Sequence, residues 1–289
     1  MLGDVTNIGV NVLNDVATLI IVSLGLSIVF GMMGVINMAH GEFIMIGSFT
    51  VIIAARHGLP LWAGMLVAPV IVGVLGVLTE RLLIRRLYGK RIEGTLLATF
   101  GLSLVLQQGA TLLAGSSPRG VATPFGSITV GRYAIDWYSL IVIAAAPALI
   151  GVVLVLFLCT RYGLLARATM QNRAMADSLG IDTARINMLT FGLGSAIAGG
   201  AGALLAPVLA VVPTMGVPLI SAAFIAVVLG GPAAVTGTAA SAGLLGSVRQ
   251  GVSLVSTPLL GTAALLATAT VILRLLPEGI SGRFRKVTL

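Results

Sequence analysis

Charged side chains are scarce in this sequence: lysine, arginine, aspartate and glutamate make up 9% of its 289 residues, whereas 57% are hydrophobic. So few polar groups cannot cover a soluble globule, which indicates an integral membrane protein. The apolar runs are long enough to cross a hydrocarbon core of about 30 Å as helices, and they lack the alternation typical of membrane β-barrels. The predicted fold class is therefore all-α, a polytopic transmembrane helical protein.

Cysteine and histidine are almost absent, which excludes several kinds of site. Cys159 is the sole cysteine, so the chain cannot form an internal disulfide or a thiolate metal site. His40 and His57 are the only histidines, too few for the usual multi-histidine metal sites. The sequence also has no GxxxxGK(S/T) loop, no HExxH pair and no GxSxG elbow. We therefore expect no metal, no bound cofactor and no enzymatic activity in this chain, and ATP, if used, must bind to another subunit.

Nine apolar runs are candidate membrane segments, so we expect about eight to nine segments, some of them short or discontinuous helices. The second and seventh runs are short for a span and could be half-helices. The runs cover approximately residues 16–36, 42–56, 61–79, 94–114, 138–159, 187–211, 219–231, 233–249 and 256–276. No linker or charged low-complexity tract separates them, which predicts a single transmembrane domain over residues 1–289.

Basic residues fall in short segments between the apolar runs, as the positive-inside rule requires, and this pattern argues against nucleic acid as a partner. Three segments hold most of these residues and should be cytoplasmic: Arg81, Arg85, Arg86, Lys90 and Arg91; Arg161, Arg167, Arg173 and Arg185; Arg283, Arg285 and Lys286. Counting the runs between them places the N-terminus outside and the C-terminus in the cytoplasm. Residues 115–137, which contain several glycines and prolines, then lie outside as a loop or re-entrant turn.

Two interruptions of the apolar pattern point to discontinuous helices. The first lies at residues 37–41, and the second, rich in glycine and proline, runs from Gly230 to Gly237. Paired interruptions in the two halves of a chain indicate broken helices around a transport site.

Residues 31–47, GMMGVINMAHGEFIMIG, place Asn37, His40 and Glu42 in an otherwise apolar stretch. A charged side chain in the middle of a lone membrane helix costs roughly 2.5 to 3.5 kcal/mol, so such groups usually face protein or a water-filled path. Together with Gly41 they can satisfy backbone groups freed at a helix break, or they can line a passage in which Asn37 binds a solute and Glu42 attracts its cationic part. A hairpin here would place these residues near the cytoplasmic surface, whereas a discontinuous helix would place them deeper.

Thr95, Thr99, Ser103 and Gln107 recur every four residues and therefore share one helix face. A polar stripe inside lipid must face protein or water. It can pack against another helix through small hydroxyl residues, or it can face a solute.

Residues 160–186 have the most soluble character of the whole sequence. Several apolar residues can share a helix face here while charged ones lie elsewhere, and Gly180 is suited to end the helix: the apolar set is Leu164, Ala168, Met175 and Leu179, and the charged set is Arg167, Arg173 and Asp177. A short amphipathic cytoplasmic helix is suited to docking into a partner's groove. The alternative is a helix that lies on the lipid headgroups.

Five stretches resemble the membrane permease subunits of ABC importers for branched-chain amino acids and, in a close branch, urea and short amides. They are GLSIVFGMMGVINMAHGEFIMIG, TLLATFGLSLVLQQ, RYGLLARATMQNRAMADSLGI, AFIAVVLGG and the terminal LPEGISGR. Asn37, His40, Gly41 and Glu42 match the family's early motif. The resemblance spans essentially the whole chain.

The resemblance implies a bacterial inner-membrane assembly among membrane lipids. Its expected partners are a second related permease or a second copy, two cytoplasmic ATPase subunits that bind ATP and Mg²⁺, and an extracytoplasmic solute-binding protein. The resemblance also implies that the region around Gln171 to Gly180 couples to the ATPase. The coupling candidates are Arg167, Gln171, Asn172, Arg173, Met175, Ala176, Leu179 and Gly180.

The solute is predicted from two motifs that disagree. ATMQNRAMA resembles the urea and amide branch, and LPEGISGR resembles the amino-acid branch. We favour branched-chain or related amino acids, with urea or a short amide as the alternative. A stand-alone passive channel is a further alternative, against which the amphipathic basic segment argues.

Overall fold

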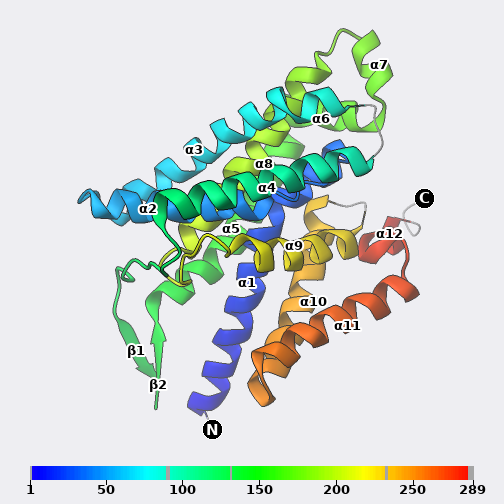
Figure 1. The fold of residues 1–289 in the computed structure, drawn as a ribbon. Helices are drawn as coiled ribbons and strands as arrows, with labels where there is room; N and C mark the ends of the chain where they lie inside the picture. Colours follow the sequence, from blue (N-terminus) through cyan, green and yellow to red (C-terminus); the bar gives the residue numbers. More distant parts are fainter. Residues whose placement is uncertain (1, 89–91, 131, 232–233, 286–289) are drawn as a thin grey trace. The chain divides into compact units, whose positions relative to one another are not determined.

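The computed structural model describes residues 2–88, 92–130, 132–231 and 234–285, and nearly all of its regular structure is helical (Figure 1). The elements, in chain order, are α1 (Leu2–Met33), α2 (His40–Arg56), α3 (Leu61–Leu82), the 3-10 helix η1 (Ile84–Leu87), α4 (Ile92–Ala114), β1 (Ser127–Val130), β2 (Tyr133–Asp136), α5 (Trp137–Cys159), α6 (Arg161–Gln171), α7 (Arg173–Ser178), α8 (Thr183–Leu205), α9 (Gly216–Gly230), α10 (Ala234–Val255), α11 (Pro258–Leu275) and α12 (Gly279–Arg285). Parts of the predicted topology depend on four residues that lie outside the described ranges: Lys90, Arg91, Pro232 and Lys286.

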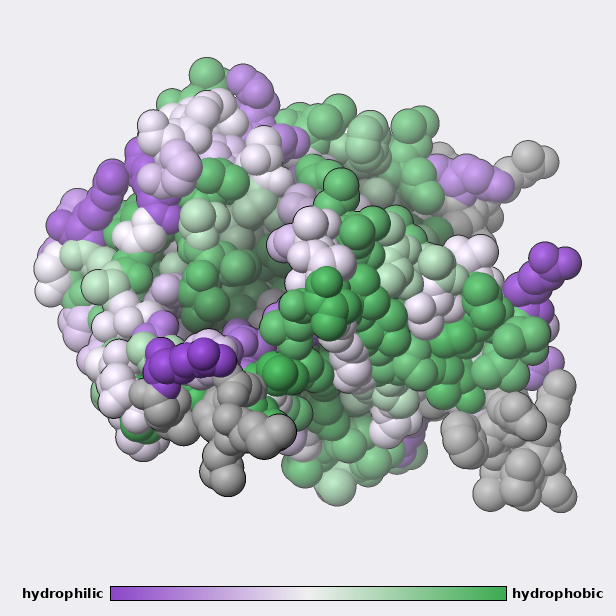
Figure 2. Space-filling view, turned by 90° about the horizontal axis from the view of Figure 1, so that it is seen from below, coloured by the Kyte–Doolittle hydropathy of each residue, from purple (hydrophilic) through white to green (hydrophobic). Residues whose placement is uncertain are grey.

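The helices confirm the predicted polytopic helical fold. Within the described ranges, six helices are long and apolar enough to cross a membrane, and α9 with α10, bent by 120°, brings the number to seven if the pair is one broken span. The predicted count of eight to nine is higher because it included α2, which has 17 residues, and counted α9 and α10 separately. Hydrophobic side chains cover much of the face shown in Figure 2, as expected of a surface in contact with lipid.

Two helices begin earlier than the approximate apolar runs from which they were predicted. The first helix begins at Leu2 rather than near residue 16, because its polar side chains are accommodated within the helix: Asn11 Nδ2 donates to Asn7 Oδ1 one turn earlier, at 3.3 Å. Helix α8 begins at Thr183 rather than at residue 187, because the Asp182 side chain caps it by accepting the backbone N–H of Arg185 at 3.0 Å.

The predicted loop at residues 115–137 contains a short β-hairpin that the sequence analysis missed. Strands β1 and β2 pair antiparallel, with Ser127 opposite Asp136 and Ile128 opposite Ile135. Each strand has only four residues, and only β1 (SITV) alternates polar and apolar residues, so the sequence carries no clear strand signal here.

Residues 24–121 and 151–220 form one compact unit, in which α2 packs on α8 through small residues. A Cβ on Gly202 of α8 would lie 2.8 Å from the carbonyl carbon of Ile44 in α2. Ser48 of α2 donates a hydrogen bond of 2.8 Å to the Gly202 carbonyl. The two backbones therefore approach as closely as glycine allows, which fixes the position of α2.

The second compact unit, residues 1–23, 122–150 and 221–289, has an apolar core. The buried members of this core come from α1, α9, α10 and α11: Leu19, Ala226, Leu229, Ala242, Leu245, Leu265 and Ala269. Burial of leucine and alanine stabilises this core, and glycines pack closely in the same unit: a Cβ on Gly230 would lie 2.7 Å from the carbonyl carbon of Gly237.

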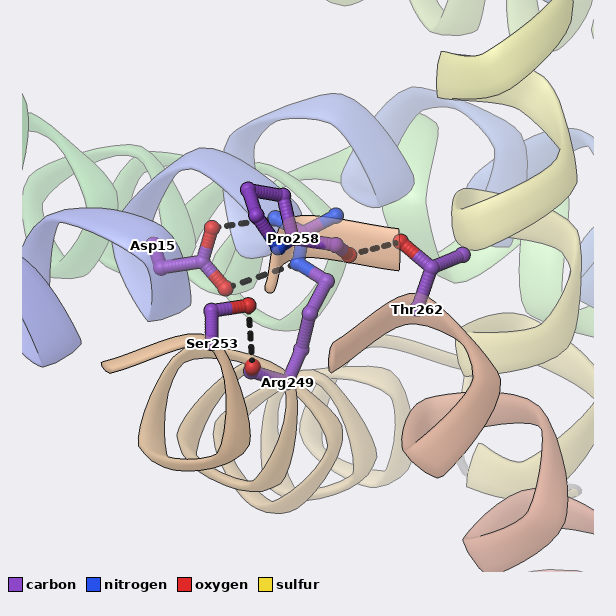
Figure 3. A network of polar contacts seen from close by, with 5 residues as sticks. All are labelled: Asp15, Arg249, Ser253, Pro258 and Thr262. Atoms are coloured by element: carbon purple, nitrogen blue, oxygen red, sulfur yellow. Dashed lines mark hydrogen bonds and ion pairs between the residues drawn. The ribbon is translucent and has the colours of Figure 1, made fainter. Parts of the chain in front are cut away.

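An ion pair joins α1 to α10 within this second unit (Figure 3). Arg249 Nε donates to Asp15 Oδ2 at 2.9 Å, and Arg249 Nη2 donates to Asp15 Oδ1. Next to it, Ser253 Oγ donates to the Arg249 carbonyl at 2.8 Å, and Thr262 of α11 donates to the Pro258 carbonyl at 3.1 Å. Asp15 is thus paired in the two-pronged geometry that suits a guanidinium and a carboxylate.

Candidate functional site

The polar residues of the early motif lie at a break between α1 and α2. Helix α1 ends at Met33 and is followed by Gly34, whose φ of +65° favours glycine and whose N–H donates to the Phe30 carbonyl at 2.9 Å. Asn37 Oδ1 then accepts the N–H of Ala39 at 3.1 Å, forming a local turn that leads into α2 at His40. The Asn37 side chain therefore satisfies one backbone N–H group at the break.

Glu42 is enclosed in the first turn of α2 and is only 1% exposed. Its Oε1 accepts a hydrogen bond of 2.7 Å from Ser103 Oγ of α4. Its Oε2 is buried without a hydrogen-bond partner among the described residues. The position at a helix N-terminus favours a negative charge, but no arginine or lysine of the described chain forms an ion pair with this carboxylate.

Glycine at positions 41 and 216 brings the start of α9 against the start of α2. A Cβ on Gly216 would overlap Glu42 Oε2 and would lie 2.7 Å from the carbonyl carbon of Gly41. The overlap with Glu42 Oε2 and the 2.7 Å approach to Gly41 are both closer than a real Cβ atom allows, so only glycine fits at position 216. The close approach encloses the Glu42 carboxylate.

Helix α4 supplies the hydroxyl groups that face the break. Thr99 Oγ1 accepts the N–H of Met38 at 3.1 Å and lies 3.1 Å from the Ile36 carbonyl. Thr95 and Ser103 are buried beside it on the same face of α4. The stripe of Thr95, Thr99, Ser103 and Gln107 thus has the shared face expected from its spacing, and Thr99 and Ser103 reach the early motif directly.

His40 and Asn37 are as buried as Glu42, at 0% and 1% exposed. The His40 ring packs against α1, where a Cβ on Gly25 would lie 2.8 Å from His40 Cε1. Asn37 Nδ2 has no hydrogen-bond partner among the described residues. The structure therefore brings the three predicted polar residues together inside the protein.

A groove of about 600 Å³ lies between α2 and α4. Its lining consists of Ile46, Phe49, Thr50, Ile53, Arg56, His57, Val105, Leu106, Gly109, Ala110, Leu113, Ala114 and Arg119. Apolar side chains dominate this set, and three basic side chains join them with no carboxylate in the lining. Such a groove suits a molecule that has an apolar part and an anionic group.

The segment predicted to couple to an ATPase forms two helices rather than one. Asn172 breaks the chain between α6 and α7 with φ of −155° and ψ of 98°, and its Oδ1 accepts the N–H of Met175 at 3.0 Å. The prediction that Leu164 and Ala168 share one continuous helix face with Met175 and Leu179 was therefore wrong. The local preference of asparagine for capping a new helix ends the first one.

Gly180 ends α7 as predicted. It has φ of +80°, its N–H donates to the Asp177 carbonyl at 3.0 Å, and the Ile181 N–H donates to the Ala176 carbonyl at 3.1 Å. Ala176 is buried, whereas Met175 and Leu179 are 62% and 74% exposed. Helix α7 thus presents two large apolar side chains on its surface.

The other coupling candidates differ in exposure. Gln171 and Asn172 are exposed, whereas Arg167 is half-buried and donates to the Phe157 carbonyl. Arg173 is exposed, and its guanidinium lies 4.8 Å from the centre of the Tyr88 ring.

Sequence analysis missed several polar groups that the structure pairs. Tyr88 Oη donates to Glu80 Oε1 at 2.8 Å, and Glu80, near the end of α3, is 0% exposed. The only signal was a carboxylate directly after the predicted third span. In the described part of the chain, no cluster of three or more histidine, cysteine or acidic side chains is arranged to hold a metal.

Comparison with known proteins places these features in context. The sequence matches the profile described as branched-chain amino acid transport system / permease component over residues 8–275. It is 30% identical over 283 residues to the high-affinity branched-chain amino acid transport system permease protein LivH of Escherichia coli K12, covering 92% of each chain. It is 32% identical over 254 residues to the corresponding protein BraD of Pseudomonas aeruginosa, covering 82% of each, and 27% identical over 250 residues to a probable LivH of Methanocaldococcus jannaschii, covering 81% of this chain and 75% of the relative. No solved structure matches the chain.

Proposed function

The chain belongs to the family of ABC permease components of branched-chain amino acid transport systems, and we propose that it carries a branched-chain or related amino acid into the cytoplasm. A permease component forms the membrane path and is not itself an enzyme. The inward direction, the solute and the ATP-driven partners are parts of the proposal.

The proposed solute path is the seam between α2 and α4. Glu42 and Ser103 are hydrogen-bonded at one point of this seam, and Ile46 and Leu106, each about one turn further along, begin the groove. One observation carries the proposal: a buried carboxyl group that has no cation lies next to an apolar groove. Arg56 and other basic residues line that groove.

Each part of an apolar amino acid would have a matching group along this seam. Arg56 lies 14 residues beyond Glu42 in α2, about 21 Å along the helix, so a single amino acid would meet these groups in succession. Basic side chains of the groove would first attract the solute carboxylate, the apolar walls would accept its side chain, and Glu42 would receive the ammonium group further along the seam. Urea and short amides have neither an apolar branch nor a carboxylate. Together with the names of the related permeases, the groove therefore favours an amino acid over urea.

Since Glu42, Asn37 and His40 are enclosed in this structure, transport would require the seam to open. Alternating access, driven by ATP binding and hydrolysis on two partner subunits, would expose them. The proposed assembly lies in a bacterial inner membrane with the N-terminus outside and the C-terminus in the cytoplasm. It includes a second permease, or a second copy of this one, and an extracytoplasmic solute-binding protein.

The proposed ATPase contact is the surface of α7. Met175 and Leu179 are the exposed apolar side chains there, and Arg167, Gln171, Asn172, Ala176 and Gly180 shape or flank the helix. An exposed apolar pair on a short helix suits a groove in a soluble partner better than it suits water.

Reconstitution tests the function. The permease pair, the ATPases and the binding protein would be placed in liposomes, and uptake of labelled leucine would be measured with and without ATP. We expect ATP-dependent uptake that isoleucine and valine inhibit and urea does not. Uptake by the single chain at the same rate without ATP would instead show a passive channel.

A matched pair of glycine variants tests the path. Gly109 lines the groove, Gly101 does not, and both lie in α4 with open space where a Cβ would be. We expect Gly109→Leu to fill the groove and lower uptake by about tenfold, equivalent to about 1.4 kcal/mol, while Gly101→Leu leaves uptake within about twofold. Equal effects of the two variants would exclude the groove from the path.

A further inference from the structure

Arg173 begins α7, yet its charged group turns back onto the permease itself. Its guanidinium carbon lies 4.8 Å from the centre of the Tyr88 ring, a cation–π geometry. A guanidinium stacked on its own chain is less available to a partner than an exposed side chain without such a contact. The position of Arg173 on the coupling segment therefore does not by itself make it an ATPase contact.

Tyr88 continues the connection to α3. Its hydroxyl donates to Glu80 Oε1 at 2.8 Å, and Glu80 is fully buried. Burial, followed by the hydrogen bond to Glu80, raises the pKa of Tyr88, so its hydroxyl stays a proton donor at neutral pH. Arg173, Tyr88 and Glu80 thus form one chain of contacts from α7 to the end of α3.

A second contact attaches the other half of α7 to α8. Thr183 Oγ1, in the first turn of α8, donates to Asp177 Oδ1 of α7 at 2.6 Å. Helix α7 is therefore held at its first residue to α3 and at its fifth residue to α8.

Helices α3 and α8 are themselves in close contact. A Cβ on Gly192 of α8 would lie 2.6 Å from Val77 Cγ2 of α3, and a Cβ on Gly76 of α3 would lie 3.4 Å from the Gly192 Cα and would overlap Ser195. Packing this tight transmits displacement rather than absorbing it, because close-packed interiors have little free volume. Helix α8 packs with the same closeness on α2, which carries Glu42.

We propose that Arg173, Tyr88 and Glu80 form an internal strut, which makes α7 move together with α3, α8 and α2 when a partner displaces it. This proposal rests on the proposed ATPase coupling. It gives different roles to different residues along α7. Met175 and Leu179 contact the partner, and Arg173 passes the movement inward. All of these elements belong to the unit of residues 24–121 and 151–220.

The first test uses the purified permease without any ATPase. Hydrogen exchange of the amides in residues 173–183 would be compared among Arg173→Ala, Tyr88→Ala and the wild-type chain. We expect both variants to speed this exchange by about fivefold, because each removes one attachment of α7. Arg185→Ala is the matched control, since Arg185 is exposed and pairs only locally with Asp182.

The second test uses the reconstituted transporter and separates the strut from docking. Arg173→Ala should keep ATPase co-purification within about twofold of wild type while lowering uptake per ATP hydrolysed by about tenfold, a coupling loss of about 1.4 kcal/mol. Met175→Glu should instead abolish co-purification. Tyr88→Phe keeps the ring and loses the hydrogen bond to Glu80. Its rate of hydrogen exchange and its uptake per ATP hydrolysed should both lie between those of Tyr88→Ala and wild type.

Unchanged exchange in Arg173→Ala and Tyr88→Ala would overturn the strut, and so would loss of ATPase binding in Arg173→Ala as complete as in Met175→Glu. If the wild-type chain binds no ATPase at all, the proposed function fails, and hydrogen exchange alone then decides whether the strut exists. If Tyr88→Ala does not fold, Arg173→Gln and Tyr88→Phe replace it in the same measurements.

Discussion

Asp15 of α1 and Glu42 of α2 are both carboxylates in apolar helices, but their surroundings are opposite. Asp15 accepts hydrogen bonds from two nitrogen atoms of Arg249, and the paired side chains are 17% and 25% exposed (Figure 3). Glu42 is 1% exposed and accepts a hydrogen bond from Ser103. One carboxylate is paired with a guanidinium inside the protein, and the other carboxyl group is enclosed without a cation.

This difference separates a carboxylate with a structural partner from one that, under the proposed function, would receive the solute ammonium when the seam opens. A buried charge that has a partner contributes to the fold, whereas one without a partner costs desolvation energy that the fold must offset elsewhere. Retaining Glu42 at that cost is expected where the missing cation comes with the solute. The substitutions below test the difference, beginning with the largest expected effect.

The glycine that encloses Glu42 should be the least tolerant position. In Gly216→Ala the new Cβ would overlap Glu42 Oε2 and lie 2.7 Å from the Gly41 backbone, which cannot move aside as a side chain can. We expect a loss of about 3 kcal/mol in the free energy of unfolding, because overpacking forces the two backbones apart. Thermal unfolding in detergent would measure it. Gly243→Ala, with open space at its Cβ, is the control, and equal unfolding temperatures for both variants would contradict the close contact.

Breaking the ion pair should have the next largest effect. Asp15→Asn leaves Arg249 partly buried with a weaker partner, and we expect it to lower the free energy of unfolding by about 2 kcal/mol. The single charge reversals Asp15→Arg and Arg249→Asp should each lower the free energy of unfolding. The chain that carries both substitutions should recover at least half of either loss. A double-mutant cycle of unfolding measurements checks this, and additive losses would show that the two side chains do not stabilise each other.

Glu42→Gln should affect transport far more than stability. Glutamine keeps an oxygen acceptor for Ser103 and replaces the buried carboxyl group with a neutral group of similar size, so the free energy of unfolding should change by less than about 1 kcal/mol. If the carboxylate receives the solute ammonium, uptake should fall by at least about tenfold. Loss of stability equal to that of Asp15→Asn, with normal uptake, would make Glu42 a structural residue like Asp15.

Hydropathy and spacing predicted the approximate positions of the helices that carry both carboxylates, although the first predicted run began at residue 16 and left Asp15 outside it. Apolar runs gave the approximate helix positions, the four-residue spacing of Thr95, Thr99 and Ser103 placed these residues on one face, and Gly180 marked the end of α7. These are local properties, because each depends on residues within one or two turns of one another.

Contacts between distant residues could not be predicted in the same way. The hydrogen bond from Ser103 to Glu42 joins positions 61 residues apart, and the Asp15 pair with Arg249 joins positions 234 apart. No periodicity within one helix indicates which other helix lies opposite. At Asn172 the prediction failed for a local reason. The amphipathic pattern favoured one continuous helix, but the Asn172 side chain caps α7 and ends the preceding helix.

The smallest expected effect concerns tyrosines of the unit that carries Glu42. Burial raises the pKa of Tyr162 above its ordinary value of 10.0, an effect that the hydrogen bond with Thr190 partly offsets, and burial likewise raises the pKa of Tyr88. Above about pH 10 the unfolded chain therefore releases these protons while the folded chain retains them, so the free energy of unfolding should fall as the pH rises. Unfolding temperatures between about pH 9 and pH 11 should show this decline, and it should be shallower in Tyr162→Phe, which removes one of the titrating groups. Tyr133→Phe in the β-hairpin is the matched control. A decline as steep in Tyr162→Phe as in wild type would mean that water reaches the Tyr162 hydroxyl, and the region beside the coupling segment would then be less enclosed than the site around Glu42.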